Sequence, residues 1–490
     1  MGLVILSLGI LVNNLNRISL DRFPFHIIEP NHTNPEQEQV RRPALNQSNK
    51  SMKILLVSPV RDEHQFTNKG ILIPQLALFI LKGLTPEKHE VKIVEEEYMA
   101  LDMDEECDVV AISCMTSNAY RGYRIADAFR EKGIKVIMGG IHPSILPEEA
   151  LAHADAVVVG EAEGVWEKIL EDIESGNLQQ RYHEPNPDLD RYIPKDFSTL
   201  AKKRMGKLVP LQTSRGCPYN CDFCCVSDIF GKKIKLIPVE HIVKDIQASG
   251  GRNFIFLDDN IIGNKKYARE LFKALIPLKI RWIGQSSISF AHDIEMMKLA
   301  KKSGCKGLFI GLESVVESNN HQFSKLKSLE DTQQSIKKIL KMGIFIQASV
   351  IFGFDDDTHE IFGQTIKFLR KNRVSLASIN ALTPYPGTAV FEKFKKTGRL
   401  LHEKWEYYDH HTVVFQPKNM TPLELQIGKI KAKTDFSKIF SIIERITGNL
   451  RMPGFYIATN LGYRKLALAE SKIMRKSDSQ VMPGGEIGVE

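Results

Sequence analysis

Short apolar segments alternate with amphipathic helical segments along most of the chain, and this alternation limits the fold more than any other feature. In the first series the apolar runs are three to five residues long and rich in β-branched side chains. Between them, Gly122–Lys132 places Ile125, Ala128 and Phe129 on one helical face. Continuous apolar strands separated by helices predict a parallel sheet covered on both faces, here a doubly wound α/β domain. The expected strands are Ile54–Ser58, Val91–Val94, Val109–Ser113, Val136–Met138 and Ala156–Val159.

A second series of strand–helix units follows after residue 207. Successive units of this kind predict a barrel of parallel strands, in which polar side chains at the carboxyl ends of the strands form the active site. The expected strands are Leu208–Leu211, Asn253–Leu257, Ile280–Ile283, Gly307–Ile310, Phe345–Phe352 and Ser378–Leu382, with helices that include Tyr267–Leu275 and Asp293–Lys302.

The cysteines are the strongest chemical signal in the sequence. The chain has seven, and four lie between Cys217 and Cys225. Cys217, Cys221 and Cys224 have the spacing C-x-x-x-C-x-x-C, which can deliver three thiolates to one iron–sulfur cubane and leave the fourth iron free. A structural zinc site is the alternative, but it requires four ligands and no partner C-x-x-C pair occurs. We expect Cys225 to pack behind the cluster.

The stretch from Gln212 to Cys225 (QTSRGCPYNCDFCC) resembles the radical SAM superfamily, whose signature is C-x-x-x-C-aromatic-x-C. The resemblance implies a six-unit partial barrel and a 4Fe-4S cluster held by Cys217, Cys221 and Cys224. It also implies that the free iron binds S-adenosylmethionine (SAM) and that Phe223 contacts the adenine. An electron donor such as flavodoxin or ferredoxin is then required.

Polar residues follow several of the barrel strands, as expected for a site at their carboxyl ends. The resemblance implies that Asp258 and Asp259 receive the methionine amino group, that Glu313 faces SAM, and that the turn at Gly353 supports adenine. Gln285 follows another strand and joins the predicted SAM site. Each acid alone is also compatible with a helix N-cap or a surface turn. The sequence identifies no catalytic acid or base.

Glycine-containing turns follow the strands of the first domain. They contain Gly139-Gly140-Ile141-His142 and Gly160-Glu161, which allow a bulky ligand to approach the backbone. Ser113 and Thr116 follow the central strand and offer hydroxyl groups. A generic flavodoxin-like domain is the alternative, and no G-x-G-x-x-G dinucleotide motif follows the first strand.

This domain resembles the cobalamin-binding domain that precedes many radical SAM enzymes. The resemblance implies that Ser113, Gly139 and Gly140 line the nucleotide tail of cobalamin, and we add Thr116, His142, Gly160 and Glu161 to the predicted site. Asp62-Glu63-His64 partly matches the D-x-H-x-x-G motif that supplies a cobalt ligand, although Thr67 replaces its final glycine. His64 is therefore a candidate axial ligand, with a solvent-exposed loop histidine as the favoured alternative.

Composition and charge define the remaining boundaries. The 490-residue chain is 43% hydrophobic and 26% charged, which predicts two to four globular domains. We expect an N-terminal extension, disordered or mis-called (1–51), a cobalamin-binding-like domain (52–183), a linker (184–206), a radical SAM domain (207–400) and a helical C-terminal region (401–490). The net charge is only +7, and the sequence contains no block of five like charges, so no nucleic-acid partner is predicted.

The N-terminal apolar run Leu3–Val12 is too short to cross a bilayer, which needs about 20 residues. No Lys or Arg precedes it and no small-residue cleavage site follows, so a secretory signal is not expected. We predict a cytoplasmic protein without a transmembrane segment. A membrane-surface anchor at residues 3–12 is the alternative.

The combined resemblance, nearest to the hopanoid-methylase-like branch, implies a radical methyltransferase that acts on an unactivated carbon of a small molecule or lipid. One alternative is an oxidative cyclase, or another radical rearrangement, acting on a porphyrin-like or natural-product substrate. The other is a non-catalytic cobalamin or SAM sensor, which has no need of the cysteine triad. Methylthiotransferases use additional N-terminal cysteines, whereas Cys107 and Cys114 have the character of small core residues.

Overall fold

The computed structural model describes residues 51–61, 73–197, 208–231, 233–320 and 328–478. Its first sheet has six parallel strands in the order β2-β1-β3-β4-β5-β6. The strands are β1 (Lys53–Ser58), β2 (Glu90–Glu95), β3 (Val109–Ser113), β4 (Lys135–Gly139), β5 (Ala156–Val159) and β6 (Arg181–His183). The helices around them are α2 (Leu76–Leu84), α3 (Ala119–Glu131), α4 (Ile141–Ile145), α5 (Pro147–Leu151) and α6 (Trp166–Ser175).

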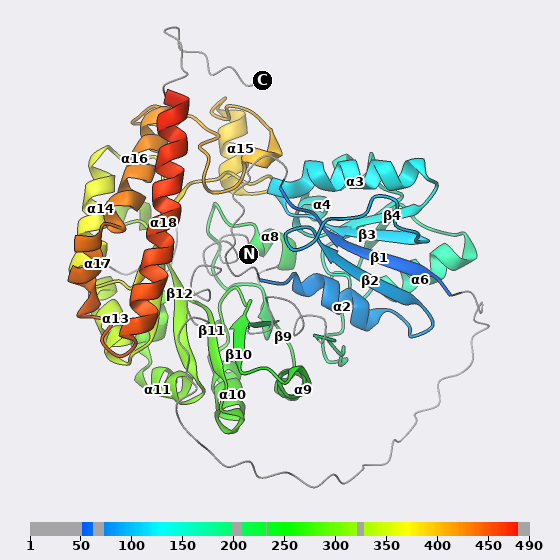
Figure 1. Cartoon of the computed structure of the whole chain (residues 1–490), viewed down its shortest axis with the longest axis horizontal. Helices are drawn as coiled ribbons and strands as arrows, with labels where there is room; N and C mark the ends of the chain where they lie inside the picture. Colours follow the sequence, from blue (N-terminus) through cyan, green and yellow to red (C-terminus); the bar gives the residue numbers. More distant parts are fainter. Residues whose placement is uncertain (1–50, 62–72, 198–207, 232, 321–327, 479–490) are drawn as a thin grey trace.

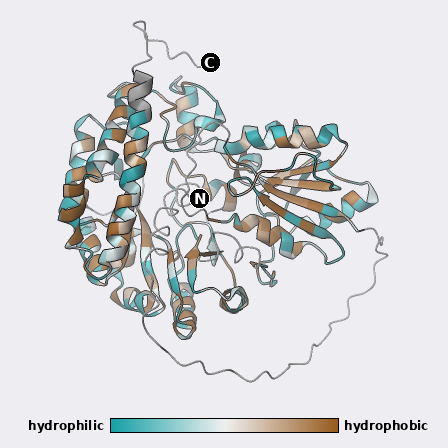
Figure 2. Ribbon diagram, viewed as in Figure 1, coloured by the Kyte–Doolittle hydropathy of each residue, from teal (hydrophilic) through white to brown (hydrophobic). Residues whose placement is uncertain are grey.

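Both faces of this sheet are buried, because side chains alternate along each strand. In β1, Ile54 and Leu56 belong to the core that includes α2 and α6, whereas Leu55 and Val57 belong to the core formed with α3. Figure 2 shows the strands as hydrophobic ribbons between two-toned helices. The strand order reverses between β1 and β3, and in such sheets ligands bind beyond the carboxyl ends of the strands at this switch point.

The second sheet contains six parallel strands in the order β7-β10-β11-β12-β13-β14, so each strand lies beside its neighbour in sequence. They are β7 (Val209–Leu211), β10 (Asn253–Phe256), β11 (Arg281–Ser286), β12 (Cys305–Glu313), β13 (Phe345–Phe352) and β14 (Leu376–Ala381). The intervening helices are α9 (Val239–Ser249), α10 (Lys265–Leu275), α11 (Ile294–Lys302), α12 (Glu317–Asn320), α13 (Leu329–Lys341) and α14 (Glu360–Lys371). The strands at the two edges do not pair with each other, so the barrel is partial.

A short antiparallel ribbon and a group of helices complete the described chain. The ribbon pairs β8 (Ser214–Arg215) with β9 (Lys235–Leu236), and between them lies α8 (Val226–Phe230). After β14 come α15 (Ala389–Lys396), α16 (Pro422–Phe436), α17 (Ile439–Ile446) and α18 (Pro453–Asp478). The short 3₁₀ turns are η1 (Thr116–Asn118), η2 (Ile276–Leu278), η3 (Ile288–His292) and η4 (Trp405–Tyr407).

The first sheet lies beside the barrel, and α16, α17 and α18 cover the side of the barrel farthest from it (Figure 1). Within residues 184–197, the chain contacts both parts: the Phe197 ring lies 5.4 Å from Phe79, and Lys195 forms an ion pair with Asp245 at 2.7 Å. The predicted α/β class, with a doubly wound first sheet, a partial barrel and a helical C-terminal region, is confirmed.

None of the helices in the described ranges combines the length and the apolar character that a membrane crossing requires. Residues 1–50 of the predicted extension (1–51), which include the apolar run at 3–12, lie outside the described residues.

Candidate active site between the two sheets

The three cysteines of the predicted cluster lie on one loop between β8 and α8. The loop begins at Gly216, where φ is +90° and an added Cβ would lie 3.1 Å from the Lys233 carbonyl oxygen, so only glycine fits without strain. Cys221 is buried, and its carbonyl oxygen accepts a hydrogen bond from the Cys224 amide at 3.0 Å. This turn places the cysteines on a short, folded segment.

The thiol set fits an iron–sulfur cluster better than a single ion. Cys217, Cys221 and Cys224 supply three soft ligands from a compact loop, which leaves one iron of a cubane without a protein ligand. In the described part of the chain, no three Cys, His, Asp or Glu side chains converge to hold one metal ion. A cubane does not require such convergence, because each thiolate binds a different iron.

Asp258 and Asp259 follow β10, and their carboxylates accept hydrogen bonds from different residues. Asp258 is buried and accepts hydrogen bonds from the hydroxyl groups of Thr213 and Ser214 at 2.6 and 2.7 Å. Burial raises its pKa to about 6, although these hydrogen bonds oppose the rise. Asp259 instead accepts a hydrogen bond from the Gly216 amide, directly beside the cysteine loop. Asp258 thus holds Thr213 and Ser214, which precede the cysteine loop, and Asp259 holds the first residue of the loop.

Glu313 ends β12 in a strained conformation, with φ at +57°. The register between β12 and β13 shifts between Gly311 and Glu313, and the buried Glu313 carboxylate occupies the space where a Cβ on Gly311 would lie. A larger residue at position 311 would displace this carboxylate. Gly311 therefore makes room for Glu313 at the carboxyl end of the barrel. Gln285, near the end of β11, is half-buried at the same end.

The conformation of the turn after β13 is fixed by Gly353 and by Asp357. Gly353 has φ of +109°, and its amide donates a hydrogen bond to the Asp357 carboxylate at 2.8 Å. The next residue, Phe354, brings its ring to 6.1 Å from the ring of Phe223. This contact places Phe223 of the cysteine loop against the predicted adenine-supporting turn.

A cavity of about 180 Å³ lies between the carboxyl end of the first sheet and the cysteine loop. Five of the residues predicted to bind cobalamin line it: Ser113, Gly139, Gly140, Gly160 and Glu161. Its opposite wall includes Ile229 and Phe230 of α8, which directly follows the cysteines, and Leu257 at the end of β10. The cavity is therefore shared by the two predicted cofactor regions.

Gly140 brings the backbone close to the cavity wall. Its φ is +96°, and an added Cβ would lie 2.6 Å from the Cys114 carbonyl oxygen. The Ser144 hydroxyl donates to the Gly140 carbonyl oxygen at 2.6 Å and accepts from the Gly160 amide at 2.9 Å. This serine, which sequence reasoning missed, holds the two glycine turns together and itself lines the cavity.

The structure does not bring Thr116 and His142 to the cavity lining. Thr116 is buried at the start of η1. The fully buried His142 ring packs 5.6 Å from the ring of Trp405, and its Nε2 lies 3.4 Å from Glu149. His142 thus belongs to the contact between the first domain and the C-terminal region. His64, the candidate cobalt ligand, lies outside the described residues.

Arg215 connects the cavity to the cysteine loop. Its guanidinium donates hydrogen bonds to Glu161 at 2.5 Å and to Glu163, both of which follow β5 in the first domain. Lys235 on β9 forms an ion pair with Glu161. Arg215, Glu161 and Glu163 all line the cavity, and their side chains are almost completely buried. This network joins the two domains beside the cysteines.

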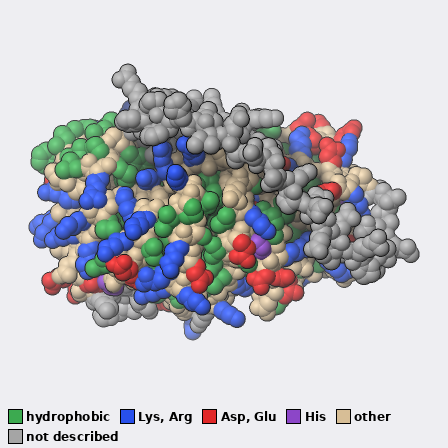
Figure 3. Space-filling view, turned by 90° about the horizontal axis from the view of Figure 1, so that it is seen from below, with side chains coloured by type: hydrophobic (Ala, Val, Ile, Leu, Met, Phe, Trp, Pro, Cys, Tyr) green, Lys and Arg blue, Asp and Glu red, His purple; other side chains and the backbone are tan. Residues whose placement is uncertain are grey.

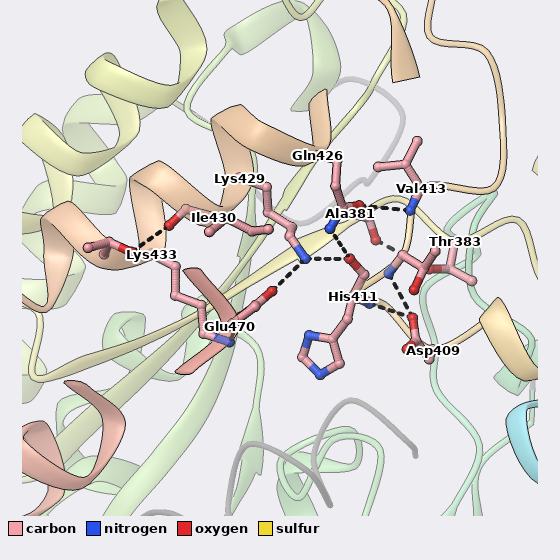
Figure 4. A network of polar contacts seen from close by, with 12 residues as sticks. Ala381, Thr383, Asp409, His411, Val413, Gln426, Lys429, Ile430, Lys433 and Glu470 are labelled. Atoms are coloured by element: carbon pink, nitrogen blue, oxygen red, sulfur yellow. Dashed lines mark hydrogen bonds and ion pairs between the residues drawn. The ribbon is translucent and has the colours of Figure 1, made fainter. Parts of the chain in front are cut away.

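A second buried network lies where the C-terminal helices meet the end of β14 (Figure 4). Lys429 and Lys433 of α16 both form ion pairs with Glu470 of α18, at 3.1 and 2.6 Å. Lys429 also donates to the carbonyl oxygen of His411, and the amide of His411 donates to Asp409. The helical spacing 429/433 is visible in the sequence, but its partner on α18 is not.

The two histidines beside this network are neutral. Burial lowers the pKa of His410 to about 3 and that of His411 to about 4. The Tyr385 hydroxyl lies within hydrogen-bond distance of His410 Nε2, at 2.9 Å, while His411 Nδ1 is a buried atom with no hydrogen-bond partner among the described residues. The His410 carbonyl oxygen accepts a hydrogen bond from the Ala381 amide at 2.9 Å, which places the pair at the end of β14.

Comparisons with known proteins identify the fold. Residues 211–369 match the family described as "Radical SAM superfamily", and residues 71–170 match "B12 binding domain". The chain is 32% identical over 414 residues to bacteriochlorophyllide d C-12(1)-methyltransferase of Chlorobaculum tepidum, covering 81% of this chain and 90% of the relative. It belongs to the cobalamin-binding radical SAM enzymes. The C-8(2)-methyltransferase of the same organism is 31% identical, covering 82% of this chain and 94% of the relative.

Other members of the cobalamin-binding radical SAM family are more distant. Hopanoid C-2 methylase of Rhodopseudomonas palustris is 24% identical, covering 68% of this chain and 66% of that protein. The predicted family is confirmed, and the two bacteriochlorophyllide methyltransferases match better than the hopanoid methylase does. An anaerobic magnesium-protoporphyrin IX monomethyl ester cyclase of Cereibacter sphaeroides is 23% identical, covering 66% of this chain and 58% of that protein.

Two solved structures share the fold of this cobalamin-binding radical SAM chain. The radical SAM methyltransferase TsrM from Kitasatospora setae, with cobalamin and a [4Fe-4S] cluster bound, has a TM-score of 0.63 at 16% identity and covers 88% of this chain and 100% of that one. OxsB, with aqua-cobalamin and SAM bound, has a TM-score of 0.65 at 13% identity and covers 90% of this chain and 82% of that one. The prediction of an enzyme, rather than a sensor, is confirmed by the two bacteriochlorophyllide d methyltransferases, which are more than 30% identical to this chain.

Proposed function

We propose that the protein transfers a methyl group to an unactivated carbon of a small organic molecule or lipid. The observation that carries the proposal is the shared cavity. Ser113 and Gly140 of the cobalamin-type domain form one wall, and α8, directly after the cysteine loop, forms the other. A methyl donor held in the first domain would then face the radical site of the second across a single space.

The residues divide the work between the two domains. Cys217, Cys221 and Cys224 would hold a [4Fe-4S] cluster, and Phe223, Asp259, Gln285, Glu313 and Gly353 would bind SAM. When bound, these groups supply hydrogen abstraction from the substrate, and cobalamin supplies the methyl group. The two glycine turns leave room for cobalamin, and the buried Arg215–Glu161 contact fixes the position of one domain relative to the other. Apolar residues around the cavity exclude water from the reaction.

The relatives narrow the expected substrate. Two of them act on bacteriochlorophyllide d and another is a hopanoid methylase, so we propose a large, mostly hydrophobic ring system as the substrate class. We further propose a cytoplasmic enzyme that receives electrons from a flavodoxin or ferredoxin. None of the seven cysteines, all of which lie in described parts of the chain, forms a disulfide, which fits a reducing compartment.

A labelling experiment tests methyl transfer. A deletion strain and its parent are grown with methionine carrying a deuterated methyl group, and their lipid and pigment extracts are compared by mass spectrometry. We expect one labelled methyl group that is present in the parent, absent from the deletion strain and restored by the wild-type chain. Restoration by the Cys217→Ala variant would contradict the proposal. A parent product that is dehydrogenated or cyclised without label would instead favour the oxidative cyclase.

A further inference from the structure

The C-terminal helices carry an unusual concentration of exposed apolar side chains. Thirteen large hydrophobic residues are exposed in the described part of the chain, and nine of them lie between residues 423 and 468. The three most exposed are Phe440 (72%), Leu450 (66%) and Ile443 (61%), all within residues 440–450. Figure 3 shows hydrophobic side chains gathered at the end of the molecule that carries these helices. Contiguous exposed apolar surface of this kind marks an interaction site.

Helix α17 presents this surface because it is amphipathic. Ile442 and Arg445 face inward, and Arg445 donates hydrogen bonds to the carbonyl oxygens of Val374 and Ser375 at 3.0 and 2.9 Å. The opposite side of the helix carries Ile439, Phe440 and Ile443, and Leu450 follows in the next loop. These four residues are called the α17 apolar face below. The buried Arg445 anchors the helix, so the apolar face is held outward by the fold.

Two basic grooves border the α17 apolar face. One runs between α14, α16 and α17, and the other runs between α13, the end of α14 and Leu450. Together they are lined by nine Lys and Arg side chains and by only two acidic ones, Asp435 and Glu444. The Arg370 guanidinium lies 5.7 Å from the centre of the Phe440 ring, so the basic and apolar surfaces are in contact.

Much of the positive charge in these grooves is uncompensated. Glu444 pairs with Arg370 and Arg373, and Asp435 pairs with Lys438. Within the described ranges, no acidic side chain forms an ion pair with five other lysines of the grooves: Lys337, Lys341, Lys367, Lys371 and Lys431. A second copy of the chain placed on the α17 apolar face would bring two such basic rims together, and their repulsion disfavours a dimer.

We propose that the α17 apolar face and its basic rim dock the enzyme on the surface of an anionic lipid bilayer. An amphipathic helix that inserts Phe and Ile side chains at the interface, while Lys and Arg contact the headgroups, binds in this way. The apolar side chains supply insertion, and each lysine near an anionic surface adds attraction that falls with salt. The observation is independent of the reaction proposed above.

Vesicle co-sedimentation of the full chain tests the docking. The probes are vesicles of pure phosphatidylcholine and vesicles that contain phosphatidylglycerol. We expect binding to the anionic vesicles, weakened at high salt, and little binding to the neutral ones. The affinity of the Phe440→Glu/Ile443→Glu variant for anionic vesicles should fall by roughly tenfold or more, because both apolar side chains are replaced by charges that the surface repels. Lys341→Glu/Lys371→Glu should weaken binding without touching the apolar face.

Matched controls separate docking from unfolding and from other partners. Ile294→Glu replaces another exposed isoleucine, at the start of α11, and should bind as the wild type does. Thermal unfolding of all variants is followed by circular dichroism, because the exposed positions predict unchanged folding. Equal binding of the wild type to neutral and anionic vesicles, or to neither, would overturn the proposal. A wild-type dimer that Phe440→Glu converts to a monomer would assign the face to a second copy instead.

Discussion

Arg215 of the barrel domain donates a 2.5 Å hydrogen bond to Glu161 of the first domain, and both side chains are almost completely buried. The residues are 54 positions apart, and Arg215 lies two positions before the first cysteine of the cluster loop. This buried, charge-assisted hydrogen bond fixes the cysteine loop against the glycine turns of the cavity.

Arg215→Met should destabilise the fold and uncouple SAM cleavage from methyl transfer. The substitution leaves Glu163 buried without its cation, a loss for which about 3–5 kcal/mol is typical. We expect a lower melting temperature, and less methylated product for each SAM cleaved. Calorimetry and product analysis measure both.

Arg191→Met is the matched control, since Arg191 forms a similar two-bond contact with Glu167 on the exposed surface. Surface pairs of this kind contribute about 0–1 kcal/mol. If both variants have the same melting temperature and the same ratio of product to cleaved SAM, Arg215 does not fix the relative position of the two domains.

Gly140→Ala should weaken cobalamin binding. The new Cβ would lie 2.6 Å from the Cys114 carbonyl oxygen and 3.1 Å from Ser113 Oγ, so the cavity wall must move. Hydroxocobalamin binding is measured through fluorescence quenching, because Trp166 lines the cavity. We expect affinity to fall by roughly tenfold or more.

Gly133→Ala controls for backbone strain. Gly133 also has a positive φ, +77°, but an added Cβ there would meet no atom within 4 Å. This variant should carry a comparable conformational cost and still bind cobalamin. Normal binding by Gly140→Ala would show that the glycine turn does not contact the cofactor.

The local features of this enzyme were readable from the sequence, whereas contacts between distant segments were not. The cysteine spacing and the strand-end positions of Asp259 and Glu313 depend on neighbours along the chain, and apolar runs predicted every strand that carries them. His142 was predicted at the cobalamin site because it follows Gly139-Gly140. Its ring instead packs on Trp405, a contact that depends on where the C-terminal region folds back.

Charged networks were harder to predict for the same reason. Lys433 and Glu470 are 37 residues apart on two helices, and nothing in either helix identifies the other as its partner. Asp258 shows a different limit. It occupies the expected strand end, but its carboxylate accepts hydrogen bonds from Thr213 and Ser214, and the direction of a side chain at a strand end is set by the neighbouring strand.

Cys225 should be dispensable for the cluster, although it adjoins Cys224. Cys225→Ala should retain about four irons per chain after anaerobic reconstitution, because three thiolates hold a cubane of this type. Each of Cys217→Ala, Cys221→Ala and Cys224→Ala should lose most of the iron and the cleavage of SAM to 5′-deoxyadenosine. Iron analysis and electron paramagnetic resonance check this. Cluster loss in Cys225→Ala with retention in Cys224→Ala would reassign the third ligand.

Acid should destabilise the C-terminal network between about pH 6.5 and 4. The half-buried His411 side chain, whose Nδ1 atom is enclosed, lies near Lys429, Lys433, Asp409 and Glu470. Desolvation, reinforced by Lys433, lowers its pKa from 6.5 to about 4. In this interval His411 binds a proton in the unfolded chain but not in the folded chain, and the neighbouring His410, whose pKa is lowered to about 3, acts in the same direction. The contribution of His411 is therefore complete above pH 6.5 and is lost as the pH falls toward 4, by about 3 kcal/mol at most.

His411→Gln should reduce this pH dependence, because glutamine does not titrate, while the contribution of His410 remains. Melting temperatures of the wild type and the variant are compared from pH 7.5 to pH 4.5 by circular dichroism. His359→Gln, which replaces an exposed histidine at the start of α14, serves as the control and should keep the slope of the wild type. Parallel curves for the wild type and His411→Gln would mean that other groups, such as the buried carboxylates, dominate the loss of stability in acid.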